Sequence, residues 1–132
     1  MAILDKIEQS IKNGSEPLLC QNNRLPITIK DFWAWSASDL MSNATRSRFA
    51  EFIVATATNV DLGIPRQEWE PYDLLTPEGI KIEVKSSAYI QSWHQKQLST
   101  ITFSIKPARY WNSKNGELES IAKRHADIYE MV

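Results

Sequence analysis

The sequence predicts a mixed α/β domain in which helices flank a sheet. Three observations support this: a helical stretch with a broad apolar surface, several short segments in which apolar and polar residues alternate, and turn residues between them. The chain has 132 residues, 42% hydrophobic, with five Trp, so one domain with a real core can form. We expect a single domain over residues 1–132, with an N-terminal helical appendage at 1–42 and the core at 43–132.

The overall composition excludes several classes of protein. A formal charge of −1 indicates that any attraction to nucleic acid must be local rather than spread over the molecule. Cys20 is the only cysteine, which excludes an internal disulfide and a zinc cluster built on thiolates. The first residues lack the pattern of a signal peptide, and no apolar run approaches membrane-spanning length. We therefore expect a cytoplasmic protein without a membrane partner.

The first third of the chain has the weakest pattern. Apolar residues at helical spacing predict a helix over residues 2–12, which Asn13-Gly14 would end. Residues 15–30 contain two prolines and are expected to be irregular. Residues 31–43, rich in aromatic side chains, indicate a short helix whose Trp residues serve packing.

A longer helix is predicted from Asn43 to about Thr58, with Asn43 or Ser42 as its cap. Phe49, Phe52, Ile53, Val54 and Ala57 give it a broad apolar surface, and Glu51 lies inside that run. A buried carboxylate without a partner is costly, so Glu51 should have one. A salt bridge to Arg48 or Arg46 is one explanation.

In the second half of the chain, apolar and polar residues alternate in several short segments, which predicts strands. A turn at 76–79 has Pro77 in its second position and Gly79 in its fourth. The expected elements are strands at 69–75, 80–87 and 99–106, a short helix within 116–125, and a last strand within 126–132.

Three charged residues near that turn carry the chemical argument. Glu83 and Lys85 share one face of their strand, because side chains alternate along a strand. Pairing Asp73 with Glu83 places Asp73 on that face as well. This register also collects a convincing apolar face on the opposite side, made of Tyr72, Leu74, Ile82 and Val84. We therefore predict this register.

Two adjacent carboxylates repel one another unless a cation lies between them. A hard divalent ion such as Mg²⁺, or Mn²⁺, suits oxygen ligands of this kind. Lys85 could then orient or deprotonate a metal-bound water and stabilise charge on a phosphate. Glu51, delivered by the preceding helix, could bind the metal directly or through water.

Read as Pro71-x-Asp73-x9-Glu83-Val84-Lys85, these residues resemble the signature of the PD-(D/E)XK nuclease superfamily. Glu51 resembles the acidic residue that many members carry on the helix before the first core strand. The resemblance covers roughly residues 43–132, and Pro71 departs from it by not adjoining Asp73. It implies a restriction-endonuclease-like core: a mixed four-stranded sheet flanked by helices, in the order α-β-β-β-α-β.

The resemblance also implies an activity, the Mg²⁺- or Mn²⁺-dependent hydrolysis of phosphodiester bonds in DNA by an endonuclease. By analogy, Asp73 and Glu83 would hold the metal with the Val84 carbonyl, Lys85 would serve the attacking water, and Glu51 would assist as catalytic residue and ligand. A nuclease with one site per chain commonly needs two copies to cut both strands, so we also consider a homodimer.

Polar side chains after the Lys suit phosphate and base contacts: Ser86, Gln91, Gln95 and Lys96. Arg46, at the start of the longer helix, could touch phosphate or position that helix. A polar surface loop explains the same residues equally well.

Simpler readings remain open at this stage. Glu83 and Lys85 could form an ion pair on a solvated sheet face, and Asp73 could cap the turn near Thr76. The main alternative function is a catalytically inactive nuclease-fold module that binds nucleic acid or another protein. The sequence does not distinguish DNA from RNA.

Overall fold

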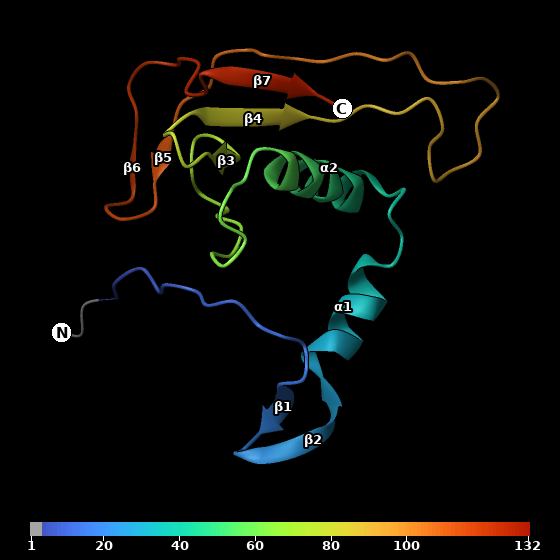
Figure 1. The fold of residues 1–132 in the computed structure, drawn as a ribbon, viewed down its shortest axis with the longest axis vertical. Coiled ribbons are helices and arrows are strands. Elements are labelled where there is room, and N and C mark those ends of the chain that lie inside the picture. Colours follow the sequence, from blue (N-terminus) through green and yellow to red (C-terminus); the bar gives the residue numbers. More distant parts are fainter. Residues whose placement is uncertain (1–3) are drawn as a thin grey trace.

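The computed structural model describes residues 4–132 and has a mixed α/β fold (Figure 1). The described part contains two helices and seven short strands. In chain order these are β1 (Pro17–Cys20), β2 (Asn23–Thr28), α1 (Ile29–Ala37), α2 (Asn43–Ala57), β3 (Leu74–Leu75), β4 (Lys81–Lys85), β5 (Trp111–Asn112), β6 (Glu117–Leu118) and β7 (Ile128–Met131). Neither helix has the length and apolar character needed to cross a membrane within residues 4–132.

The main sheet has three strands in the order β3-β4-β7. Strand β4 runs antiparallel to β3 and parallel to β7, and α2 lies against β4 (Figure 1). The buried apolar side chains come from this helix and this strand: Ala50, Val54 and Ala55 of α2, and Ile82 of β4. The core therefore sits between α2 and the central strand.

The predicted register of the β3–β4 pair is confirmed. Leu74 pairs with Ile82 and Leu75 with Lys81, and Asp73 lies directly before these paired residues, with its amide donating to the Ile82 carbonyl. The first strand is shorter than expected, because only Leu74–Leu75 of the predicted 69–75 is a strand. The turn between them forms as predicted, with Gly79 at φ +85°, a conformation in which a side chain would be strained.

Helix α2 is also confirmed and places Glu51 on its inner face. Ser42 is the N-cap, and its hydroxyl accepts a hydrogen bond from the Thr45 amide at 3.4 Å. Glu51 is only 7% exposed, in line with the buried Ala50 and Val54. A carboxylate is thus held at the interface between the helix and the sheet.

The N-terminal region forms a hairpin, where irregular structure was expected. Gln21 and Asn22 connect β1 and β2 with φ values of +48° and +65°, the two positive angles of a tight hairpin turn. Helix α1 follows at once, capped by Thr28, whose hydroxyl and amide exchange hydrogen bonds with Asp31. This helix confirms the short aromatic helix expected near residues 31–43.

The helix predicted over residues 2–12 does not form in its described part, residues 4–12. Residues 4–13 have no helix or strand, and Ile3 lies outside the described residues. Leu4 is 96% exposed and Ile7 is 79% exposed. A helix this short is marginal in water unless its apolar side packs against something, and here it does not.

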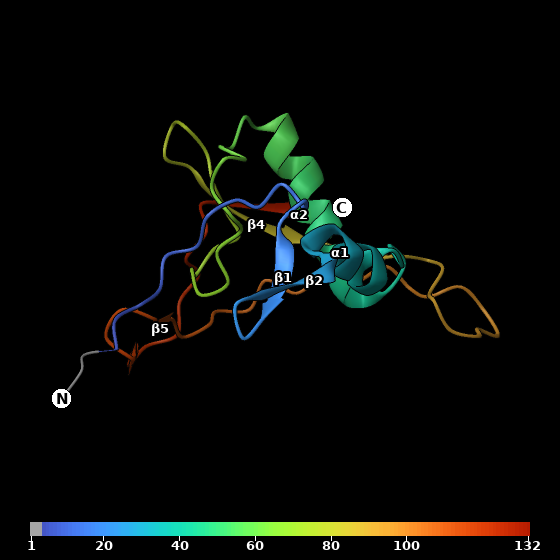
Figure 2. The same cartoon turned by 90° about the horizontal axis from the view of Figure 1, so that it is seen from below.

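Two further elements differ from the prediction, and the expected four-stranded core does not form in the described residues. Residues 99–106 form no strand, and the segment between β4 and β5 runs out past the end of β4 before it turns back toward β5 (Figure 1 and Figure 2). The place beside β4 belongs to β7, which confirms the last predicted strand.

Residues 116–125 contain β6 instead of a helix. Glu119 explains this, because its carboxylate accepts a hydrogen bond from the Tyr110 amide at 3.0 Å and contacts His125 at 2.7 Å. Its amide also donates to the Tyr110 carbonyl at 2.8 Å. These contacts with the facing segment replace the hydrogen bonds of a helix.

Candidate active site

Asp73 lies directly before β3 and faces the end of β4. Its carboxylate accepts a hydrogen bond from the Val84 amide at 2.7 Å, and its own amide donates to the Ile82 carbonyl at 3.0 Å. Burial raises the pKa of Asp73, and the nearby charges of Glu51 and Glu83 raise it further. The Val84 amide and the Arg66 charge act in the opposite direction. Asp73 is thus within electrostatic reach of both other predicted carboxylates.

Glu83 and Lys85 form a close ion pair along β4. Their side chains are 24% and 31% exposed, so the pair is only partly solvated. This is the same-strand pairing that the sequence left open as a simpler explanation. Lys85 can reach a water or a phosphate only by giving up part of its contact with Glu83.

The carbonyl of Val84 belongs to the same edge of β4 as Asp73. The Ile82 carbonyl and the Val84 amide both bond to Asp73, whereas the carbonyls of Lys81 and Lys85 bond to the β7 side. Because peptide groups alternate along a strand, the Val84 carbonyl faces the β3 edge, beyond the last paired residue of β3. This orientation agrees with its predicted role as a backbone ligand.

Glu51 has a partner that the sequence did not indicate. Arg66 approaches it with two nitrogens, Nε at 2.5 Å from Oε2 and Nη2 at 2.9 Å from Oε1. The expected partners were Arg46 and Arg48, but neither bonds to Glu51 in the described part of the chain. The two-pronged contact satisfies both carboxylate oxygens of this buried group.

The donor chemistry fits a hard divalent cation, but the arrangement is not that of a formed metal centre. Three carboxylates and a backbone carbonyl are oxygen ligands of the type that Mg²⁺ and Mn²⁺ take. Burial is the main cause of the raised pKa of Asp73, and the nearby carboxylates of Glu51 and Glu83 raise this pKa further, an effect that a cation would relieve. Within residues 4–132, however, no three acidic, His or Cys side chains lie close enough together to hold a metal ion.

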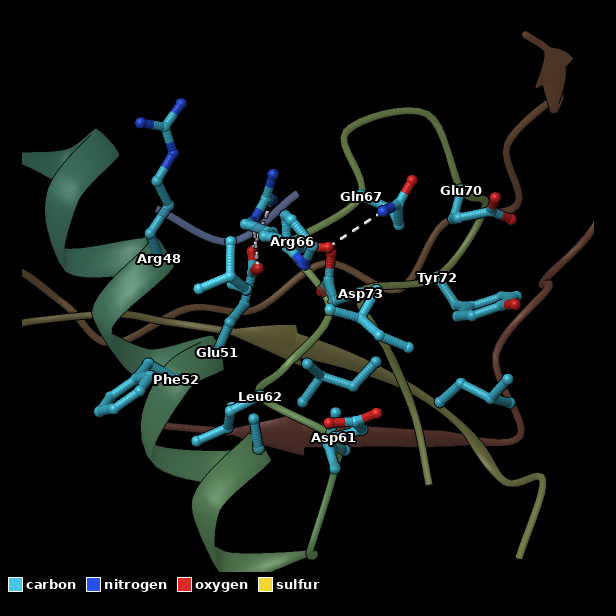
Figure 3. A pocket seen from close by; sticks show the side chains of 17 residues that line it. Arg48, Glu51, Phe52, Asp61, Leu62, Arg66, Gln67, Glu70, Tyr72 and Asp73 are labelled. Atoms are coloured by element: carbon cyan, nitrogen blue, oxygen red, sulfur yellow. Dashed lines mark hydrogen bonds and ion pairs between the residues drawn. The ribbon is translucent and has the colours of Figure 1, made fainter. Parts of the chain in front are cut away.

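A cavity of about 490 Å³ opens beside Glu51 and Asp73 (Figure 3). Its floor is apolar, with side chains such as Phe52 and Leu62, and Arg48, Arg66, Gln67 and Glu70 add polar groups. Gln67 donates to the Pro65 carbonyl at 3.0 Å, which ties the loop after α2 to itself. The two carboxylates therefore border a space large enough for part of a substrate.

Four of the five residues predicted to contact nucleic acid come together in one network. Arg46 of α2 donates to the Ser86 hydroxyl and to the Gln91 side-chain oxygen, both at 3.3 Å. Gln95 accepts from the Gln91 amide at 2.7 Å. Lys96 is exposed and takes no part in these bonds. The network joins the start of α2 to the segment that leaves β4.

A family model described as Bacteriophage T4 endonuclease IV matches residues 29–131. The chain belongs to this family. No curated protein and no solved structure matches it. Membership in the bacteriophage T4 endonuclease IV family indicates a nuclease. The match does not extend to the PD-(D/E)XK superfamily or to a metal, so both remain predictions.

The match to the bacteriophage T4 endonuclease IV family coincides with structural boundaries. It begins at the first residue of α1 and ends at the last residue of β7. It therefore includes Glu51, Asp73, Glu83 and Lys85, and it leaves out the β1–β2 hairpin. The predicted core at 43–132 lies almost entirely within the match.

Arg66 is the residue that sequence reasoning missed. The sequence around Glu51 gave one indication of such a partner, since a buried carboxylate on an apolar helix requires a positive charge close by. Three arginines near Glu51 in the sequence could have met that need, and the choice depends on how the loop after α2 returns. That loop brings Arg66 back over the helix, 15 positions beyond Glu51.

Proposed function

We propose that this chain is a divalent-metal-dependent DNA endonuclease that acts through Asp73, Glu83, Lys85 and Glu51. The observation that supports the proposal is the carboxylate of Asp73 bonded to the Val84 amide of β4, the strand that also carries the Glu83–Lys85 ion pair, in a member of an endonuclease family. Carboxylates paired across two strands beside a lysine are suited to phosphodiester hydrolysis.

In the reaction, the oxygen of a water forms a bond to phosphorus, and the bond from phosphorus to a sugar oxygen breaks. A bound Mg²⁺ or Mn²⁺ supplies positive charge for the phosphate and lowers the pKa of a water. Asp73 and Glu83, with the Val84 carbonyl, are the ligands we assign to it. Glu51 completes the negative side of the site from α2.

Lys85 has the role of orienting the attacking water. Its ammonium already contacts Glu83, a proposed metal ligand on the same strand. Exchanging part of this contact brings the ammonium to the water or to a phosphate oxygen. There its positive charge stabilises the negative charge that develops during the attack. The attacking water releases its proton to solvent, and the leaving sugar oxygen takes a proton from solvent, so the step balances.

The network around Arg46 supports a place for the DNA backbone next to the site. Arg46, Ser86 and Gln91 offer a guanidinium, a hydroxyl and an amide, the groups that commonly contact phosphate. They lie just beyond Lys85 in the chain and at the start of the helix that carries Glu51. We propose that they position the strand to be cut, and that a homodimer would cut both strands.

The test is incubation of purified protein with closed-circular and linear DNA, in Mg²⁺ or in EDTA. We expect nicking or linearisation of circles in Mg²⁺ only, and loss of this activity in Lys85→Ala. Lys81→Ala is the matched control, because Lys81 lies on the same strand, is exposed, and contacts the Tyr72 ring at 5.6 Å instead. Equal activity of wild type and Lys85→Ala would contradict the assignment of Lys85.

A non-catalytic binding module is the second candidate, and one observation favours it. In residues 4–132 Glu83 and Glu51 are already paired with Lys85 and Arg66. If wild type cleaves neither DNA nor RNA but retards DNA in a gel, the binding module is the better description. An Mg²⁺-induced rise in Tm that requires Asp73 would argue against it.

A further inference from the structure

The contact between Glu51 and Arg66 is the most fully formed charged pair beside the candidate site. Glu51 is buried, its side chain is 9% exposed, and Arg66 bonds to both of its oxygens. A buried carboxylate loses its hydration and needs a positive charge close by. Arg66 supplies that charge in the protein as described.

Several features would allow the Arg66 guanidinium to separate from Glu51. Its side chain is 37% exposed, and it comes from the loop between α2 and β3, not from a helix or a strand. Its third nitrogen, Nη1, donates to Glu68 at 2.8 Å, and the Glu68 side chain is 63% exposed. A guanidinium released from Glu51 therefore keeps a carboxylate partner at the surface.

The charge of the same guanidinium also acts on Asp73. Arg66 and Asp73 each feel the charge of the other, and both residues border the cavity in Figure 3. A divalent cation at Asp73 and Glu51 would meet the positive charge of Arg66 at close range. Both oxygens of Glu51 already bond to Arg66, so a divalent cation that binds Glu51 competes with the guanidinium for these oxygens.

We propose that Arg66 is an exchangeable counter-ion, which neutralises Glu51 when no metal is bound and competes with the divalent cation for the same carboxylate. This inference rests on the proposed function, because it assumes that the metal uses Glu51. It assigns Arg66 a positioning role: it holds Glu51 in place until the metal replaces it.

The test compares metal binding by wild type and Arg66→Gln, measured by calorimetric titration of the metal-free protein with Mg²⁺ alone and Mn²⁺ alone. Removal of the competitor should lower the metal Kd about tenfold, the effect of roughly one ion pair. The Tm without metal should fall, and the rise in Tm on adding metal should grow. Neither measurement depends on cleavage.

Arg48→Gln is the matched control. Arg48 borders the same cavity, but it makes no ion pair within residues 4–132, and its guanidinium points away from Glu51 (Figure 3). We expect its Kd for metal to stay within about twofold of wild type, the small effect of an unpaired surface charge. A tenfold change in this variant as well would mean that general charge, and not exchange at Glu51, sets the affinity.

A double-mutant cycle with Glu51→Gln isolates the shared carboxylate. In that background Arg66→Gln should leave the metal Kd unchanged. Should Arg66→Gln fail to fold, Arg66→Lys keeps the charge but loses the two-pronged contact, and its metal Kd should fall between those of wild type and full removal.

The outcomes separate this inference from the proposed function. Wild type that binds metal in an Asp73-dependent way, with a Kd that Arg66→Gln leaves equal or weakens, overturns the exchange and leaves the nuclease assignment intact. Wild type that binds neither Mg²⁺ nor Mn²⁺ overturns both the metal-dependent function and the exchange.

Discussion

The region around α2 and β4 and the region of the N-terminal hairpin and α1 are held together differently. Helix α2 buries four residues, including Glu51, whereas α1 buries none and leaves Trp35 86% exposed. Polar contacts around α2 join distant parts of the chain, as between Arg46 and Ser86, 40 positions apart. Those around α1 stay within the N-terminal region, as where the Lys30 amide donates to the Gly14 carbonyl.

This difference separates the part that holds the chemistry from the part that does not. Within residues 4–132, no hydrogen bond joins the segment 4–37 to the segment 43–132. The proposed site lies wholly in the second segment, where packing and charge fix each side chain against elements far away in sequence. Changes near α2 and β4 should therefore cost activity or stability, and matched changes in the N-terminal region should cost little.

The largest effect should come from Asp73→Ala. This change removes the carboxylate at the centre of the proposed site and leaves the Val84 amide without its acceptor. We expect the cleavage rate to fall at least about 100-fold, as when one group that stabilises transition-state charge is lost. Initial rates on supercoiled DNA in Mg²⁺ measure it.

Asp61→Ala is the control, since Asp61 borders the same cavity but bonds to the Gly63 amide in the loop. Its rate should stay within about threefold of wild type, as for a surface change distant from the chemistry. Equal losses in the two variants would contradict a specific role for Asp73.

Next in size is the effect of Ile82→Ala on folding. Ile82 is 4% exposed in β4, the central strand of the main sheet, so truncation leaves a cavity and should cost about 2–5 kcal/mol of the free energy of unfolding. Trp35→Ala, in the exposed α1, should change it by no more than about 0.5 kcal/mol. Urea denaturation followed by circular dichroism measures both, and a larger loss for Trp35→Ala would reverse the comparison.

A smaller effect is expected from Arg46→Ala. The change removes the guanidinium that joins α2 to Ser86 and Gln91, and it should lower the free energy of unfolding by about 1–2 kcal/mol. The affinity of the protein for uncleaved DNA, measured by fluorescence anisotropy in Ca²⁺, should fall as well. Arg48→Ala, at an exposed position of the same helix, should do neither.

The smallest effect is on the pH dependence of stability. Burial raises the pKa of Asp73 above its usual 3.8, so the folded protein holds the proton more tightly than the unfolded chain. Stability is then lost as pH rises from that value through the raised pKa, and the loss persists at neutral pH. Asp73→Asn should therefore have a higher Tm than wild type at pH 7 without divalent ions.

This gain should shrink as the pH falls below 3.8, where Asp73 is protonated in both the folded and the unfolded state. Thermal melts between pH 3 and pH 8 measure the difference. Asp61→Asn, which replaces an exposed carboxylate, serves as the control. A lower Tm for Asp73→Asn at pH 7 would indicate that its charge stabilises the fold.

Local chemistry explains the elements that could be predicted. The Ser42 cap and the apolar run of α2, the alternation in β4 and the turn at Gly79 each act over a few residues, so the sequence alone indicates them. The pairing of Leu74 with Ile82 and of Leu75 with Lys81 followed from the same reasoning. The hairpin β1–β2 was missed because its turn, Gln21-Asn22, contains no glycine.

The remaining features depend on contacts between distant parts of the chain. The partner of Glu51 is Arg66 and not Arg46 or Arg48, because the loop after α2 brings Arg66 back to the helix. The neighbour of β4 turned out to be β7, which pairs Ile82 with Ile128 across a long connection. The sequence of neither strand predicts its pairing with the other, because backbone hydrogen bonds are the same for every strand and only side-chain packing selects the partner.

From its residues alone, this chain reveals a capped helix, an alternating strand and a turn, and it predicts that Asp73, Glu83 and Lys85 share one face. Whether these charged groups meet one another or other partners is a matter of folding. A charge interacts with whatever the surrounding structure brings within a few ångströms, and sequence distance does not limit that choice. Glu51 therefore pairs with an arginine that no local pattern pointed to.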